Sequence, residues 1–234
     1  MWIYGRHPVR EALRAGILPQ VVFVAEGSQL PEDFSKELSR AGIKVRSLPR
    51  EKLTQIVRTD HHQGIVADIG PFPLASLEQL LERAFQQKGV IVGLDHWQDP
   101  GNVGSIIRTA YALGATGLLI PAGRSAPLLP AVVKASAGAC FHILISQGNL
   151  LQFLTRFQKE GGKVVALDLE GQDIRKSLPE RPTLLVIGAE GPGLSPKIRE
   201  RADLVWTIPM KGTINSLGAV AAATIALWEL LQER

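Results

Sequence analysis

Apolar runs of strand length alternate with helix-length segments from residue 89 to the end of the chain, and this alternation is the strongest constraint on the fold. The runs predict strands at 90–94, 117–121, 142–146, 163–169, 183–188 and 204–209. Helical segments between successive strands are typical of a parallel sheet that is covered on both faces. The sequence therefore predicts an α/β fold with a mainly parallel sheet in residues 89–234.

A turn and a helix follow the first of these strands. Residues 99–101 (DPG) combine a proline of fixed φ with a permissive glycine, which is a turn signal. After Asn102 the apolar residues recur at helical spacing. Asn102 either caps this helix or faces a substrate. The side chain of Arg108 leans back toward the first turn, where Gly104 leaves its path open; the alternative is an ordinary solvated arginine.

Two glycine-rich loops also follow predicted strands directly. They are residues 187–195 (IGAEGPGLS) and residues 208–217 (IPMKGTINSL). Such loops let a backbone approach a ligand closely and offer it unpaired N–H groups. Because open parallel sheets bind ligands outside the carboxyl ends of their strands, we expect both loops and the Asn102/Arg108 turn to form one site.

Residues 1–70 have the pattern of a smaller α/β unit. Strands are predicted at 20–25, 43–48 and 65–69, and helices begin near Val9, Pro31 and Glu51. Arg6, Arg10 and Arg14 recur at four-residue spacing, and the plainest interpretation is a solvated helix face. Residues 71–88 begin with a proline-rich break and continue as an amphipathic helix, which predicts a linker.

Composition restricts the remaining possibilities. His61 and His62 have no cysteine or acidic partner at metal-ligand spacing, so they predict a polar turn and no metal site. The single Cys140 excludes an intramolecular disulfide and fits a reducing compartment. Neither a signal peptide nor a membrane span is recognisable, so we expect a cytoplasmic protein. The net charge of +4 is compatible with a polyanion partner but is weak support for one.

Three motifs mark the predicted edge of the sheet: DPGNVG at 99–104 with RTA at 108–110, GAEG at 188–191 continuing to Ser195, and IPM at 208–210 with Ser216-Leu217. In this order they resemble the SpoU (TrmH-like) ribose 2′-O-methyltransferases of the SPOUT class. Residues 1–70 are similar to the small RNA-binding domain of the ribosomal-RNA members, through YGRHPVREAL at 4–13 and HQGIVA at 62–67. The resemblance implies S-adenosylmethionine as cofactor, RNA as substrate, a homodimer that completes the site, and a SPOUT domain with a deep trefoil knot.

The resemblance also implies roles for individual residues. Arg108 would bind the phosphate beside the target ribose and stabilise the developing alkoxide, since an arginine rarely releases its proton and makes a poor base. Asn102 and Ser216 would position the ribose, and Glu190 would orient Arg108 or Asn102. The cofactor would be held by the backbone of Gly188, Ile208 and Leu217, with Met210 beside them.

One position departs from the family's pattern, because Gly218 follows Ser216-Leu217 where the family usually has an asparagine. This loss keeps open a non-catalytic RNA-binding protein of the same fold. A second alternative is a tRNA ribose methyltransferase, although the tRNA members lack the amino-terminal module. A Rossmann-type enzyme is disfavoured, since no G-x-G-x-x-G follows the first strand of residues 89–234. The small residues of the last helix fit either a second subunit or burial within one chain.

Overall fold

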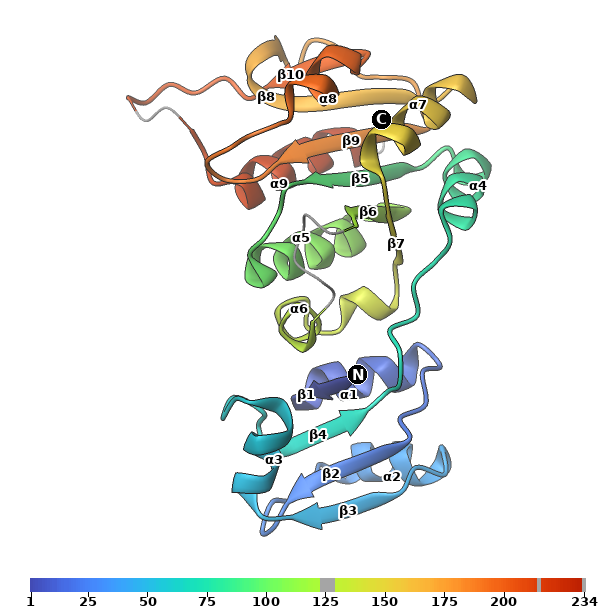
Figure 1. The fold of residues 1–234 in the computed structure, drawn as a ribbon, viewed down its shortest axis with the longest axis vertical. Helices are drawn as coiled ribbons and strands as arrows, with labels where there is room; N and C mark the ends of the chain where they lie inside the picture. Colours follow the sequence, from blue (N-terminus) through green and yellow to red (C-terminus); the bar gives the residue numbers. More distant parts are fainter. Residues whose placement is uncertain (123–128, 214–215, 233–234) are drawn as a thin grey trace.

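The computed structural model describes residues 1–122, 129–213 and 216–232, which form two sheets stacked along the long axis of the molecule (Figure 1). The smaller sheet contains the strands of the amino-terminal part, and the larger one contains the strands that follow residue 89. The mixed α/β architecture and the division into a small and a large part confirm the predicted fold class.

The smaller sheet has four strands in the order β1-β4-β2-β3. Its elements are β1 (Trp2–Tyr4), α1 (Arg6–Arg14), β2 (Val21–Ala25), α2 (Glu32–Arg40), β3 (Val45–Leu48), α3 (Arg50–Val57) and β4 (Ile65–Asp68). β2 pairs with β3 in parallel, while β4 pairs antiparallel with both β1 and β2. The predicted strands and helices are all present. β1 was not predicted, because a strand of three residues is too short to show a period.

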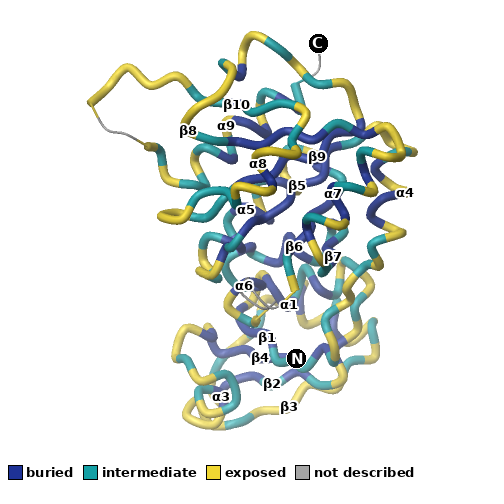
Figure 2. The backbone as a smooth tube through the Cα atoms, turned by 45° about the horizontal axis from the view of Figure 1, so that its top comes forward, coloured by how far each residue is buried: buried dark blue, intermediate teal, exposed yellow. Residues whose placement is uncertain are grey.

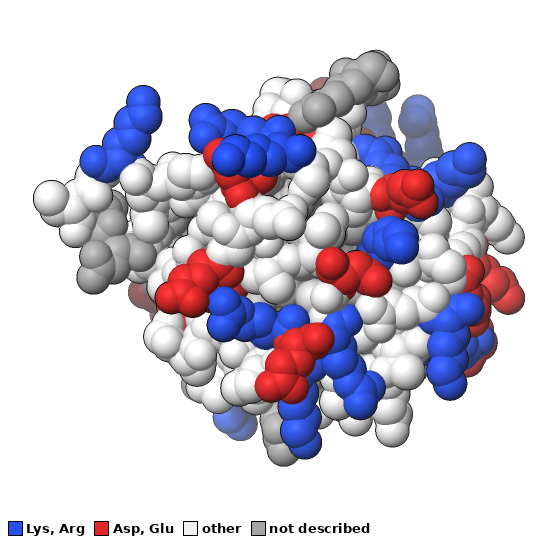
Figure 3. All heavy atoms as spheres, turned by 90° about the horizontal axis from the view of Figure 1, so that it is seen from above, with Lys and Arg blue, Asp and Glu red and all other residues white. Residues whose placement is uncertain are grey.

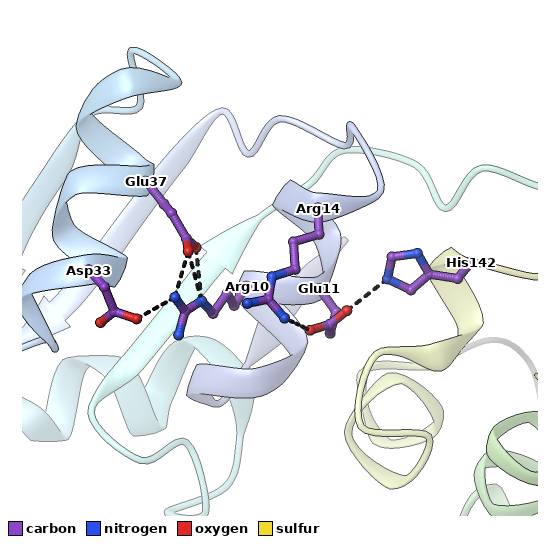
Figure 4. A network of polar contacts seen from close by, with 6 residues as sticks. All are labelled: Arg10, Glu11, Arg14, Asp33, Glu37 and His142. Atoms are coloured by element: carbon purple, nitrogen blue, oxygen red, sulfur yellow. Dashed lines mark hydrogen bonds and ion pairs between the residues drawn. The ribbon is translucent and has the colours of Figure 1, made fainter. Parts of the chain in front are cut away.

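Arg10 connects α1 to α2 and is not a solvated side chain. Its Nε lies 2.9 Å from Glu37 Oε2, and its guanidinium also pairs with Asp33 (Figure 4). These hydrogen bonds lower the pKa of both carboxyl groups. The interpretation of the three arginines as a solvated face is therefore wrong for Arg10.

His62 is likewise a structural residue and not part of an exposed polar turn. Its side chain is fully buried, and Nδ1 accepts the backbone N–H of Gly64 at 3.0 Å. Nε2 lies 3.1 Å from Thr54 Oγ1, and burial lowers the pKa of the imidazole. His61 lies in the turn and is exposed, as predicted. Among the described residues no cluster of side chains could hold a metal ion.

The segment between the two sheets ends in α4 (Leu77–Gln87). Ser76 and Gln79 form a capping box, in which each side chain accepts the other's backbone N–H at 2.8 to 3.1 Å. Leu80 and Leu81 are buried in the same hydrophobic cluster as Ile91 of the large sheet. The helix thus packs on the carboxyl-terminal part; the domain limits at 70 and 89 stay predictions.

The larger sheet has six strands in the order β10-β8-β9-β5-β6-β7, and every neighbouring pair is parallel. Its elements are β5 (Val90–Asp95), α5 (Pro100–Leu113), β6 (Gly117–Pro121), α6 (Pro130–Ala135), the 3₁₀ turn η1 (Ala139–Phe141), β7 (Leu144–Gly148), α7 (Leu150–Lys159), β8 (Lys163–Asp173), β9 (Thr183–Gly188), α8 (Pro196–Arg201), β10 (Leu204–Thr207) and α9 (Ala219–Leu231). The predicted parallel sheet is confirmed.

The two faces of the large sheet pack against different helices, and its central strands are dark in Figure 2 because both faces are covered. Val92 and Leu94 of β5 contribute to the cluster that contains residues of α5 and α9. Ile91, whose side chain points to the opposite face, joins the cluster that contains residues of α4 and α7. This burial explains why the strands have continuous apolar sequences.

Several element boundaries differ from the prediction by a few residues, and two of these differences have a clear local cause. α5 begins at Pro100, and the N-cap is Asp99, whose carboxylate accepts the N–H of Asn102 at 2.7 Å. The idea that Asn102 caps this helix is therefore wrong; proline suits the first helical position, and the cap precedes it. β7 begins at Leu144 because η1 occupies residues 139–141, next to the strand predicted to start at 142.

No helix in the described ranges is long and apolar enough to cross a membrane. Figure 3 views the molecule from the end where β10 and α8 lie, and acidic and basic side chains are interspersed on that face. The excess of positive charge is therefore not gathered there.

Candidate active site

A cleft of about 530 Å³ lies at the carboxyl ends of β9 and β10, beside the middle of β8. Its walls come from residues 167–169, from the loop after β9, and from the segment that joins β10 to α9. Six predicted site residues line it: Gly188, Glu190, Ile208, Met210, Ser216 and Leu217. The size is that of a small-molecule site, and the two glycine-rich loops meet there, as expected of loops that follow strands of one parallel sheet.

Gly188 lets the loop after β9 pack closely against the end of that strand. A Cβ at this position would lie 2.2 Å from the carbonyl carbon of Gly193, so the loop folds back against the Gly188 backbone. The N–H of Gly193 donates to the carbonyl of Ala189 at 3.0 Å, and Gly191 and Gly193 have positive φ. These glycines allow the loop to close on itself. The loop that results forms one wall of the cleft.

The loop after β9 is anchored to β5 by Asp95, which is only 5% exposed. Asp95 Oδ2 accepts two hydrogen bonds from Ser195, from its backbone N–H at 2.7 Å and from its hydroxyl at 2.6 Å. His96 Nε2 lies 3.0 Å from the same hydroxyl. Sequence reasoning did not single out Asp95 or His96. A charged residue at the end of an apolar strand was the available signal, because a buried carboxylate needs donors.

A second cleft of about 480 Å³ adjoins the first. It contains Asn102 and His96, and it shares Ala189, Glu190 and Ala219 with the first cleft. Glu190 therefore stands between the two spaces. Its Oε1 accepts the backbone N–H of Ala219 at 3.1 Å, and this bond caps the amino end of α9. In the structure Glu190 thus bonds to the backbone of Ala219, and Asn102 lies in the second cleft.

Gly218, the position that departs from the family's pattern, lies beside the carboxylate of Glu190. A Cβ at this position would lie 3.1 Å from Glu190 Oε1, the oxygen that caps α9. A longer side chain would press on that carboxylate. The glycine at 218 is thus compatible with an intact Glu190 cap.

Arg108 is the predicted site residue that the structure does not bring to either cleft. It is exposed on α5, about 9 Å along the helix axis from Asn102. Within the described ranges its side chain makes no hydrogen bond or ion pair. Gly104 does not clear a path for it, since a Cβ at Gly104 would meet Val132 O at 2.9 Å. That expectation is wrong, because Gly104 lets α6 approach α5 closely.

The last helix has a mixed environment. Ala223, Ala226 and Leu227 are buried in the hydrophobic core, whereas Ile225 is 41% and Trp228 is 60% exposed. Burial within the chain therefore accounts for one face of α9. It leaves a large aromatic side chain on the other face.

Comparison with known proteins identifies both parts of the chain. Residues 89–228 match the SpoU rRNA Methylase family, and residues 2–75 match the domain described as RNA 2′-O ribose methyltransferase substrate binding. An uncharacterized tRNA/rRNA methyltransferase from Mycolicibacterium paratuberculosis is 36% identical over 99% of this chain and 77% of its own length.

Solved structures show the same arrangement over nearly the whole chain. The SpoU methyltransferase AviRb from Streptomyces viridochromogenes, in complex with AdoMet, has a TM-score of 0.82 and 28% identity, covering 98% of this chain and 88% of that one. An AdoMet-bound rRNA methyltransferase from Sinorhizobium meliloti has a TM-score of 0.78 and 29% identity, covering 97% of this chain and 85% of its own.

Proposed function

The chain belongs to the SpoU rRNA methylase family, and we propose that it methylates ribosomal RNA, held by residues 1–70 while residues 89–234 carry out the transfer. It is an RNA ribose 2′-O-methyltransferase that uses S-adenosylmethionine. The observation that carries the proposal is the meeting of both glycine-rich loops in one cleft beside Asn102. The Rossmann-type alternative is excluded by the family.

The residues of the larger cleft suit S-adenosylmethionine. Apolar side chains dominate its lining, as an adenine ring requires, and they include Leu167, Ile187 and Leu217. The carboxylates of Asp168 and Glu190 also line it, and carboxylates favour a cationic sulfonium nearby. When bound, the cofactor supplies an activated methyl group. Backbone groups of Gly188, Ile208 and Leu217, with Met210 beside them, would hold it.

The chain's own residues then position the hydroxyl and manage its charge. Asn102 in the adjoining cleft and Ser216 in the larger one would bind the ribose, and Glu190 stands between them. Holding the reactants in line can contribute about 7–11 kcal/mol toward lowering the barrier. Arg108 would bind the adjacent phosphate and stabilise the alkoxide, while water or that phosphate takes the proton.

The position of Arg108 supports a homodimer. Since Arg108 lies outside both clefts of its own chain, a second copy that brings its α5 to these clefts would complete the site. The exposed Trp228 and Ile225 of α9 offer an apolar contact surface for that copy. Light scattering should therefore give twice the 25.3 kDa of one chain.

Trp228→Glu tests the dimer and its link to catalysis together. A charge placed in an apolar interface should produce monomers with little methyl transfer, because the site would lose its second half. Leu18→Glu is the matched control, since Leu18 is 58% exposed between α1 and β2, in the amino-terminal part of the chain. A monomeric variant that retains full transfer would contradict the shared site.

Substrate choice is tested by methylating total RNA with labelled S-adenosylmethionine and separating the products by size. Label in ribosomal RNA, mapped to a ribose 2′-oxygen, is the expected result. Label in transfer RNA alone would favour the tRNA alternative, and no label in any RNA would favour the non-catalytic one. The match of residues 2–75 to a substrate-binding domain supports the ribosomal assignment.

Two further proposals follow from family membership. The last third of the chain would form a deep trefoil knot, a topology that is rare and has no signature in local periodicity. The enzyme would work in the cytoplasm, where its RNA substrate is found and where the buried, unpaired Cys140 stays reduced.

A further inference from the structure

Tyr111 exposes its ring on the outer face of α5. Its exposed fraction is 45%, so part of the ring is open to contact from outside the chain. It follows Arg108 by three residues, so the two side chains are neighbours on one helix face. An exposed aromatic ring therefore lies beside the arginine expected to act on the RNA.

The ring of Tyr111 is held in place from one side. It stacks on the imidazole of His142, with the ring centroids 5.4 Å apart and the planes 25° apart. His142 Nε2 in turn lies 2.9 Å from Glu11 Oε2 on α1, so the pair is fixed to the amino-terminal domain (Figure 4). A ring fixed in this way loses little further freedom when it binds a flat partner.

The charges around Tyr111 suit a polyanion. Arg108 makes no hydrogen bond or ion pair in the described part of the chain, and its side chain is exposed. Arg14 of α1 lies 2.8 Å from Glu11 and is 53% exposed (Figure 4). Glu11 is shared between Arg14 and His142, the residue on which Tyr111 stacks.

We propose that Tyr111, supported by His142, is a stacking platform for an unpaired nucleobase of the RNA substrate. This rests on the proposed RNA methyl transfer and adds a residue that selects the conformation of its substrate. Tyr111 lies between Arg108 on its own helix and the amino-terminal domain, to which His142 is bonded, so RNA that contacts both would pass close to its ring. Proteins bind single-stranded RNA by stacking splayed-out bases on aromatic side chains.

The test compares three substitutions in the full-length enzyme, with fluorescein-labelled single-stranded RNA of mixed sequence as the probe. Tyr111→Ala should weaken RNA binding roughly tenfold, the loss typical of one base–aromatic stack. Tyr111→Phe should bind like wild type, because it keeps the ring. Tyr111→Leu should be nearly as weak as Tyr111→Ala. Leu178→Ala is the exposed apolar control and should bind normally.

Salt dependence separates stacking from charge. A base stack releases no counterions, so Tyr111→Ala should lower RNA affinity equally at all salt concentrations. Arg108→Ala should reduce the salt slope by about one. Affinity for S-adenosylhomocysteine should be unchanged in every Tyr111 variant, which shows that the fold is intact.

A purely structural Tyr111, which only packs His142 at the domain junction, gives opposite results. Tyr111→Ala would then melt at lower temperature but bind RNA like wild type, and this outcome overturns the platform while the proposed function stands. Equal binding by the Leu and Phe variants would also overturn it. If wild type fails to bind RNA, the proposed function fails with it.

Crosslinking tests whether RNA contacts Tyr111 even if the Tyr111→Ala variant does not fold. Wild-type enzyme irradiated with RNA that contains 4-thiouridine should form a crosslink in the peptide that carries Tyr111. Crosslinks confined to other peptides would refute the platform without any substitution.

Discussion

The two sheets of this protein differ in how their strands are arranged, and the difference indicates which part does chemistry. The six strands of the large sheet are all parallel, so their carboxyl ends meet at one edge, where the loops after β9 and β10 form the cleft. The small sheet has only one parallel pair, β2 with β3. A mixed sheet gathers no comparable set of loops. It provides a surface for binding.

Exposed basic side chains are also arranged differently in the two regions. On the rim of the small domain formed by β3 and α3, four exposed cations make no side-chain hydrogen bond or ion pair in the described part of the chain: Lys44, Arg46, Arg50 and Lys52. In the large domain Arg156, Arg175 and Arg199 are each paired with carboxylates. Arg108 makes no such pair in the described residues, and neither do Arg83 or Lys197. What distinguishes the rim is that its four cations lie on or next to two consecutive elements, and we expect this cluster to bind RNA.

The largest effect should come from Arg108, which belongs to the chemistry side of this comparison. Arg108→Ala should reduce single-turnover methylation by roughly 10²–10³, the value of one missing charge-stabilising donor. Arg108→Lys should stay badly impaired, because it lacks the planar fork that binds phosphate. Cofactor affinity should change by no more than a few-fold.

The control for Arg108 is Arg83→Ala, since Arg83 is an exposed helical arginine without an ion pair in the described ranges. It should leave both rate and stability nearly unchanged, within about 0.5 kcal/mol. Near-wild-type turnover by Arg108→Ala would contradict the catalytic role of Arg108. Arg108 would then no longer distinguish the large region as the one that carries out the chemistry.

Gly104 tests how closely the helices of the large domain must pack. Gly104→Ala places a Cβ 2.4 Å from Ala135 Cβ and 2.9 Å from two backbone atoms of α6. Overpacking costs about 1–3 kcal/mol, which should exceed the gain of about 1 kcal/mol from alanine's helix propensity. Urea unfolding should show lower stability, while Ala112→Ser on the exposed face should not. Unchanged stability would mean that α6 moves away without cost.

The sequence could predict the strands of the large sheet, because strands that are buried on both faces have continuous apolar sequences. It could predict which loops form the cleft, because all strands of a parallel sheet have their carboxyl ends at the same edge. It could not predict that Ser195 bonds to Asp95, a contact between positions 100 residues apart. The helical period placed Arg108 off the apolar face of α5, but it could not predict that the side chain lies outside both clefts.

Arg46 and Arg50 represent the binding side of the comparison. The double substitution to alanine should weaken RNA binding and reduce the salt slope by about two, because each phosphate contact contributes about one. Methylation at saturating RNA should stay near wild type, the reverse of the Arg108 result. Titrations at several salt concentrations measure both quantities. An unchanged salt dependence of RNA binding would show that the rim formed by β3 and α3 does not contact RNA.

The smallest effect is expected at the junction of the two regions, where Lys134 of α6 approaches Gly5 of the small domain. Burial lowers the pKa of Lys134, so the unfolded chain binds more protons between that lowered pKa and 10.5. The free energy of unfolding should therefore rise with pH through this window. Below the window Lys134 is charged in both states, and burying that charge lowers the stability of the folded protein. Lys134→Met should be at least as stable as wild type at neutral pH.

The pH dependence separates desolvation from a lost contact at Lys134. The difference in stability between Lys134→Met and wild type should shrink as the pH approaches 10.5, because wild-type Lys134 then becomes neutral. Lys197→Met, at an exposed lysine of α8, should show no such trend. Urea unfolding at neutral and alkaline pH measures it. If Lys134→Met were less stable than wild type by the same amount at both pH values, desolvation would not be the main effect. The lysine would then stabilise the junction of the two regions through its contacts.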